Sequence, residues 1–102
     1  MSSYNVIISA EARRQLSHCV LFLAQQSEDA ARNLQQRFIA ALRNLERLPA
    51  RFPFFNEPYL PANKYHKMFV EKWYLILYQI KDTTVYVDYV LDCRQDYRWL
   101  IH

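Results

Sequence analysis

Two neighbouring residues in the second half of the chain, His66 and Lys67, have the types that metal-independent cleavage of RNA requires. Attack of a 2′-hydroxyl on the adjoining phosphate needs a general base, a cation that stabilises the phosphorane, and an acid that protonates the leaving oxygen. His66 titrates in the range suited to the base or the acid, and Lys67 or Arg94 could supply the cation. An aromatic side chain could stack on a nucleobase. The candidate catalytic set is His66, Lys67, Arg94 and Tyr97.

These residues can act together only if the fold brings their side chains close to one another. The strand that carries His66 and the end of the last strand must share one concave face of a sheet. If the side chains scatter instead, a protein-binding role is favoured. The alternative interpretation of His66 is an ordinary exposed histidine of a strand. The lysines nearby would then only solvate a sheet edge, an interpretation that covers Lys64, Lys67 and Lys72.

Arg94 also has a structural alternative. Asp92 and Asp96 flank it and could hold it in a local ion pair, which stabilises a protein little. Further cationic and aromatic side chains could contact a nucleic acid or another target beside the catalytic set. They are Lys64, Lys72, Arg98 and Trp99.

The two cysteines form no metal or redox motif. Cys19 and Cys93 are far apart in the sequence and have no CxxC or Cys/His spacing. Both lie among apolar neighbours, which indicates buried thiols in a reducing, cytoplasmic setting. We expect no metal and no other cofactor.

The composition predicts one folded domain over residues 1–102. Hydrophobic residues make up 52% of the chain and aromatic residues 16%, which is enough for a core. No glycine is present, so the turns must use Asn, Asp, Pro or Thr. The net charge of +3 permits an acidic partner or a nucleic acid without requiring either. Residues 1–5 do not resemble a signal peptide, and no stretch is apolar for long enough to cross a bilayer, so we expect a cytoplasmic protein.

Two amphipathic helices are expected after a short strand at Asn5–Ile8. Ser9 and Ser27 are suitable N-cap residues, and each precedes acidic residues that the helix dipole favours. The first helix should run to about Gln26. The apolar stripe of the second comprises Leu34, Phe38, Ala41, Leu45 and Leu48. The short connection predicts an antiparallel helical hairpin.

The second helix is basic on the side opposite its apolar stripe. Arg32, Arg43 and Arg47 lie on that side. They can form a solvated face, or they can contact acidic segments of a partner protein or RNA.

Three strands are expected after a proline-punctuated loop at Arg51–Asn63. This loop carries three phenylalanines and should be pinned onto the core rather than form an aromatic binding platform. Tyr65–Val70 and Thr84–Leu91 alternate in polarity, whereas Trp73–Ile80 is apolar on both faces, as in a central strand. The short turns between them predict an antiparallel meander. Arg94–Ile101 should form a short C-terminal helix or turn.

The order of elements is therefore β-α-α-β-β-β. It indicates an α+β fold in which a helical hairpin packs on one face of a small antiparallel sheet.

In this order of elements and in three local stretches, the chain resembles the RelE/ParE superfamily of bacterial toxins. The stretches are Ile8–Ala12 at the first strand-to-helix junction, Tyr74–Tyr78 in the middle strand, and Val90–Asp96 where the last strand ends. The resemblance covers essentially the whole chain. It implies two helices on a curved sheet and a cognate antitoxin that wraps and silences the toxin. The basic face of the second helix is then a candidate antitoxin contact.

The resemblance implies one of two targets. RelE-like toxins cleave messenger RNA in the ribosomal A site without a metal, and ParE-like toxins poison DNA gyrase. The ribonucleases carry basic residues on the strand that matches Lys64, His66 and Lys67, and an arginine where this chain has Leu75. ParE-like toxins have an apolar residue at that position and an Arg-x-Asp after the last strand, as Arg94–Asp96 provides here.

The function predicted from the sequence is that of a type II toxin that arrests growth and is neutralised by a cognate antitoxin. Its target is either DNA gyrase or ribosome-bound messenger RNA, and Leu75 argues against the ribonuclease. The main alternative is a non-toxic interaction module that keeps the fold and the antitoxin surface, and the third is a general basic RNA-binding protein.

Overall fold

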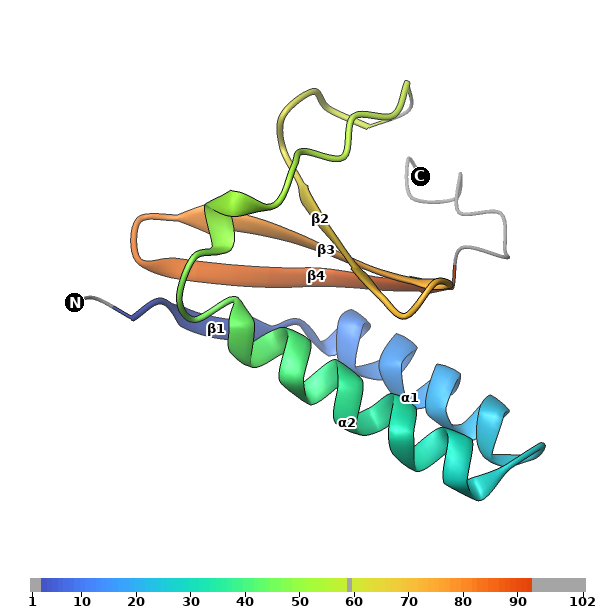
Figure 1. The fold of residues 1–102 in the computed structure, drawn as a ribbon. Helices are drawn as coiled ribbons and strands as arrows, with labels where there is room; N and C mark the ends of the chain where they lie inside the picture. Colours follow the sequence, from blue (N-terminus) through green and yellow to red (C-terminus); the bar gives the residue numbers. More distant parts are fainter. Residues whose placement is uncertain (1–2, 59, 93–102) are drawn as a thin grey trace.

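The computed structural model describes residues 3–58 and 60–92, and these form a helical layer beneath a sheet layer (Figure 1). The elements run in the expected order. They are β1 (Asn5–Ile8), α1 (Ala10–Ala24), α2 (Glu28–Asn44), the 3-10 turn η1 (Pro49–Arg51), β2 (His66–Val70), β3 (Tyr74–Lys81) and β4 (Thr84–Asp92). The predicted α+β fold is confirmed. The predicted C-terminal helix at Arg94–Ile101 lies outside the described residues. Neither of the helices described has the length and apolarity to span a membrane.

Both helices begin where the sequence predicts. The hydroxyl of Ser9 accepts the N–H of Ala12 at 2.9 Å, and that of Ser27 accepts the N–H of Ala30 at 3.1 Å. The second helix ends at Asn44, one turn before the end of the expected apolar stripe. The placement of Leu48 in that stripe is therefore wrong, because the chain turns at Leu45 and leaves Leu48 64% exposed.

The sheet has the order β1-β4-β3-β2. The last three strands form the expected antiparallel meander, with β3 between its neighbours. The first strand adds to β4 in parallel, so the complete sheet is mixed. A register shift next to Tyr78 makes Asp88 an extra residue of β4, since Leu77 pairs with Tyr89 and Tyr78 pairs with Val87.

Three of the described residues have positive φ and replace the absent glycine in tight turns. They are Asn63, Glu71 and Asp82, with φ of 56°, 55° and 55°. Asn and Asp tolerate this left-handed region, as the sequence predicts. Glu71 forms the β2–β3 turn, where a turn is expected, but it is not one of the residue types expected to form turns. Its carboxylate forms an ion pair with Arg37 of α2 at 3.0 Å, which ties the turn to the helical layer.

Each face of the sheet has its own apolar cluster. The larger cluster joins the two helices to the sheet and includes Phe38, Ile76 and Tyr78. The smaller cluster lies on the helix-free face, the side of the sheet turned away from α1 and α2; it consists of Phe55, Tyr65, Leu75, Leu77 and Leu91. The apolar β3 strand is covered on both sides, as expected of a central strand.

The aromatic loop lies against the edge of β2. Phe54 forms an isolated antiparallel β-bridge with His66. The N–H of Phe55 donates to the carbonyl of Tyr65 at 2.7 Å, and the N–H of Lys67 donates to the carbonyl of Pro53 at 2.9 Å. Phe55 is buried on the helix-free face. The loop is therefore pinned onto the core, as expected, although Phe54 stays 42% exposed.

Candidate functional site

His66 is the first residue of β2, and its imidazole is buried. The ring lies between Phe54, at 4.2 Å between centroids, and Tyr78, at 5.3 Å with planes inclined by 16°. Its Nδ1 is 2.8 Å from the carbonyl oxygen of Phe52, which accepts a hydrogen bond when that nitrogen carries a proton. The hydroxyl of Tyr78 donates to the carbonyl of Pro49 at 2.6 Å. His66 therefore holds the aromatic loop against the sheet, and it is not the exposed histidine of the alternative interpretation.

Lys67 points to the other side of the sheet. Successive side chains of a strand alternate between its faces. The Lys67 Nζ lies 5.7 Å from the ring centroid of Phe55, which belongs to the cluster on the helix-free face. His66, by contrast, stacks on Tyr78 of the helix-side cluster. A histidine and a lysine on opposite faces cannot act together on one phosphate, so the structure does not bring these two candidates together.

Leu75 is 1% exposed and lies in the core of the helix-free face. It pairs with Phe69 on one side and Leu91 on the other. The position at which the ribonucleases carry an arginine is thus filled by packed hydrocarbon here. This position of β3 therefore supplies no cation.

The two other lysines named from the sequence are exposed. Lys64 precedes β2, and its Nζ lies 5.4 Å from the ring centroid of Tyr65. Lys72 lies in the β2–β3 turn. The remaining candidates of the site are outside the described residues; these are Arg94, Tyr97, Arg98 and Trp99.

The arginines expected to contact an antitoxin are exposed on α2 and just after it. Arg32 forms a weak ion pair with Asp29, at 3.5 Å between exposed groups. Arg43 in the last turn of α2 and Arg47 make no ion pair within the described part of the chain. Two exposed cations at one end of the helix layer fit an acidic partner.

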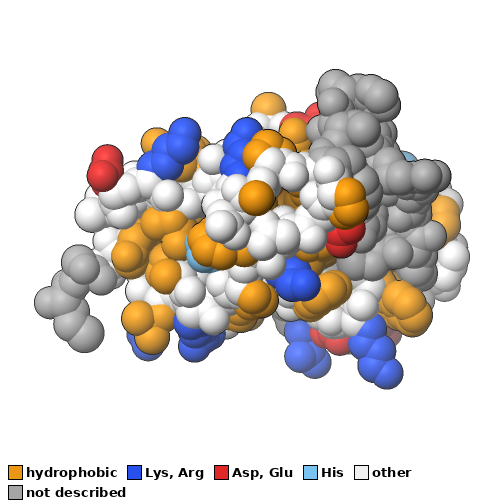
Figure 2. All heavy atoms as spheres, turned by 90° about the horizontal axis from the view of Figure 1, so that it is seen from above, with side chains coloured by type: hydrophobic (Ala, Val, Ile, Leu, Met, Phe, Trp, Pro, Cys, Tyr) orange, Lys and Arg blue, Asp and Glu red, His pale blue; other side chains and the backbone are white. Residues whose placement is uncertain are grey.

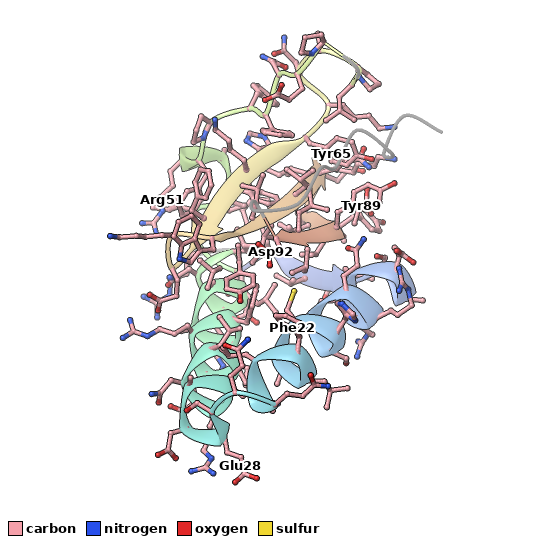
Figure 3. The ribbon with its side chains drawn as sticks, turned by 90° about the vertical axis from the view of Figure 1, so that its right-hand side faces the viewer. Phe22, Glu28, Arg51, Tyr65, Tyr89 and Asp92 are labelled. Atoms are coloured by element: carbon pink, nitrogen blue, oxygen red, sulfur yellow. The ribbon has the colours of Figure 1, made fainter. Side chains whose placement is uncertain are left out.

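Sequence reasoning missed a polar cluster on the helix-free face. The Gln79 amide donates to the carboxylate of Asp88 at 2.5 Å, and the Tyr65 and Tyr89 rings meet edge to face at 6.0 Å (Figure 3). Burial, and after it the negative charge of Asp88, raise the pKa of Tyr65 to about 12. Asp88 reaches this cluster because it is the extra residue of β4, and the alternating pattern of the strand gives no sign of a bulge.

A groove lies between α2 and the outer edge of β2. Its volume is about 480 Å³, and it is lined by Arg37, Ala40, Ala41, Asn44, Phe52, Met68, Phe69, Val70 and Glu71. The aromatic loop covers the beginning of β2 and leaves Phe69 54% exposed at this groove. Among the described residues, no group of three or more His, Cys, Asp or Glu side chains is placed to hold a metal ion.

Comparison with known proteins gives a family match. Residues 6–97 match the family model described as the ParE toxin of the type II toxin–antitoxin system parDE. No curated protein matches the chain. A solved structure of the chromosomal ParDE toxin–antitoxin system from P. aeruginosa superposes with a TM-score of 0.70. It is 9% identical and covers 87% of this chain and 95% of the other, so the likeness shows the shared fold.

Proposed function

This chain belongs to the ParE toxin family of type II toxin–antitoxin systems, and from that premise we propose that it arrests growth by binding DNA gyrase rather than by cleaving messenger RNA. A cognate antitoxin holds it silent. Gyrase is the target that the ParE resemblance implies.

The observation that carries the choice of target is the separation of His66 from Lys67. Acid–base cleavage of RNA needs the titrating group and the cation on the same phosphate. Here the imidazole is enclosed by aromatic rings on the helix side, and the ammonium group lies on the helix-free face. Leu75 removes the cation that a ribonuclease would add from β3. A toxin that binds a protein target needs none of these groups to converge.

The antitoxin surface is proposed to include the exposed arginines of α2 and its C-terminal end. Arg43 and Arg47 would meet acidic side chains of the antitoxin, since complementary charge steers association and fixes its register.

The test uses the whole chain, produced with its antitoxin and then separated from it. We expect loss of supercoiling activity and accumulation of cleaved DNA when the toxin is added to gyrase, and no cleavage of messenger RNA in the ribosomal A site. Antitoxin added beforehand should abolish the effect. Messenger RNA cleavage with normal supercoiling would contradict the gyrase assignment in favour of the ribonuclease.

Growth of a bacterial host distinguishes gyrase inhibition and messenger RNA cleavage from the non-toxic interaction module. Induction of the chain alone should arrest growth, and co-expression of the antitoxin should relieve the arrest. Normal growth with abundant folded protein would instead support a non-toxic interaction module.

A further inference from the structure

Three lysines on the helix-free face each lie close to an aromatic ring. The distances from Nζ to ring centroid are 5.4 Å for Lys64 and Tyr65, 5.7 Å for Lys67 and Phe55, and 5.9 Å for Lys81 and Tyr86. Figure 2, which views the molecule from above Figure 1, shows cationic side chains among hydrophobic ones. The rings hold the ammonium groups near the sheet while leaving them in contact with water.

The register of the sheet spreads these cations along the strands. Lys67 pairs with Leu77 of β3, and Lys81 lies four residues further along the same strand. At roughly 3.3 Å per residue, the two positions are about 13 Å apart along the strand. Tyr89 pairs with Leu77, and Tyr86 pairs with Gln79, so half-buried tyrosine rings occupy the interval between the lysines.

Few carboxylates lie beside these lysines in the described part of the sheet. Among the described residues of β2, β3 and β4, Asp88 is the carboxylate that lies with this cluster, and it accepts the Gln79 amide at 2.5 Å. Its charge also acts on the buried hydroxyl of Tyr65. Asp82 stands beyond Lys81 in the β3–β4 turn. The three lysines outnumber these two carboxylates, so the described part of this face carries a net positive charge.

We propose that the helix-free face binds a single-stranded nucleic acid, with Lys64, Lys67 and Lys81 contacting phosphates spaced along one strand and the Tyr86 and Tyr89 rings against the bases. A span of about 13 Å corresponds to roughly four nucleotides of a stacked strand. Cations that track a backbone beside aromatic rings are the usual means of binding single strands without sequence preference.

A nucleic acid fits this face better than an acidic protein does. A stable protein interface needs an apolar core that both partners bury. Most of the large exposed apolar side chains among the described residues lie on the helices, the aromatic loop and the turns. The two that belong to strands, Ile7 of β1 and Phe69 of β2, lie at opposite edges of the sheet. Between Lys67 and Lys81 the face instead carries amphipathic tyrosines. Binding of a nucleic acid at this face would be an activity distinct from inhibition of gyrase. It can be measured with an oligonucleotide in the absence of gyrase.

The experiment is fluorescence anisotropy of a labelled 12-nucleotide single-stranded DNA with the full chain freed of antitoxin. We expect the logarithm of the affinity to fall with the logarithm of salt concentration with a slope of about −2, as three contacts to a single strand predict. Replacing Lys64, Lys67 and Lys81 together by Gln should weaken binding at low salt at least about tenfold and flatten this slope. Replacing the same three residues by Arg should preserve binding.

The matched control replaces Arg13, Arg14 and Arg37 together by Gln, because it removes three exposed cations from the helical layer. It should leave DNA binding unchanged. Equal loss in this control, or unchanged binding in the folded triple Gln variant, would overturn the proposal. Equal displacement of the DNA by polyglutamate at matched charge would also overturn it, since the face would then serve acidic proteins. A labelled RNA of the same length shows whether the face distinguishes ribose from deoxyribose. A failure here leaves the supercoiling test of gyrase inhibition standing.

Discussion

The imidazole of His66 stacks on the ring of Tyr78, its partner across the β2–β3 ladder, with centroids 5.3 Å apart. The two side chains also anchor different parts of the preceding loop, because His66 contacts the carbonyl of Phe52 and Tyr78 that of Pro49. The histidine that looked catalytic in the sequence is thus part of the packing between the loop and the sheet.

His66→Gln should therefore reduce stability and leave toxin activity intact. We expect a loss of about 1–2 kcal/mol from the lost ring stack and hydrogen bond, measured by urea unfolding. Inhibition of gyrase per folded molecule should not change, nor should its pH dependence. His18→Gln removes an exposed imidazole from α1 and is the control, for which neither quantity should move. Complete loss of inhibition in a folded His66→Gln protein would instead place His66 in the surface that binds gyrase.

Gln15→Leu should destabilise the junction of α1 with β4. The Gln15 Oε1 accepts the buried N–H of Val90 at 2.7 Å, beyond the end of the β1–β4 pairing. Leucine has similar bulk but would leave that donor unsatisfied, at a cost of about 1–3 kcal/mol in unfolding free energy. Ser17→Ala on the exposed side of the same helix should cost little, so equal losses in both variants would contradict this assignment.

Tyr65→Phe should make the free energy of unfolding depend less on pH under alkaline conditions. Burial raises the pKa of Tyr65 from 10.0 to about 12, so the folded state holds this proton more tightly than the unfolded state. The resulting stabilisation is complete below pH 10 and is lost as pH rises through about 12. Unfolding free energies measured across this range should fall more steeply for the wild type than for the variant. Parallel curves would show that Tyr65 titrates normally.

The double variant Arg43→Glu, Arg47→Glu should bind the antitoxin more slowly. Two glutamates in place of two exposed arginines would repel an acidic antitoxin as it approaches. The association rate should therefore fall, most strongly at low salt. Surface plasmon resonance with the antitoxin as ligand measures this rate. Arg13→Glu reverses an exposed charge on α1 and should have a smaller effect. An unchanged association rate would place the antitoxin elsewhere, and the groove between α2 and β2 would be the next surface to test.

Much of the fold follows from local sequence signals. Ser9 and Ser27 cap the helices as expected, the apolar spacing gives both helices their buried faces, and the apolar run of β3 marks a strand covered on two sides. The absence of glycine indicated that Asn and Asp would form turns, and Asn63 and Asp82 do so. These features depend on residues that are close in the chain, where periodicity and capping chemistry operate.

The candidate site could be predicted only in part from the sequence. Alternation along a strand places His66 and Lys67 on opposite faces, and this local signal is enough to separate the two side chains. Leu75 weakened the case for a ribonuclease in the sequence, and the structure buries this side chain. The cationic face was not recognised, since Lys64, Lys67 and Lys81 belong to different segments, and only the register of β2 on β3 aligns them.

The sequence by itself determined the type of each element and the family, because hydrophobic period, caps and turn residues are local properties. Tertiary structure decided the parallel addition of β1, the bulge that turns Asp88 toward Gln79, and the enclosure of His66 by Phe54 and Tyr78. Each of these depends on contacts between segments distant in the chain. Their free energy comes from burying shared surface and satisfying backbone hydrogen bonds, and no single segment contains that information.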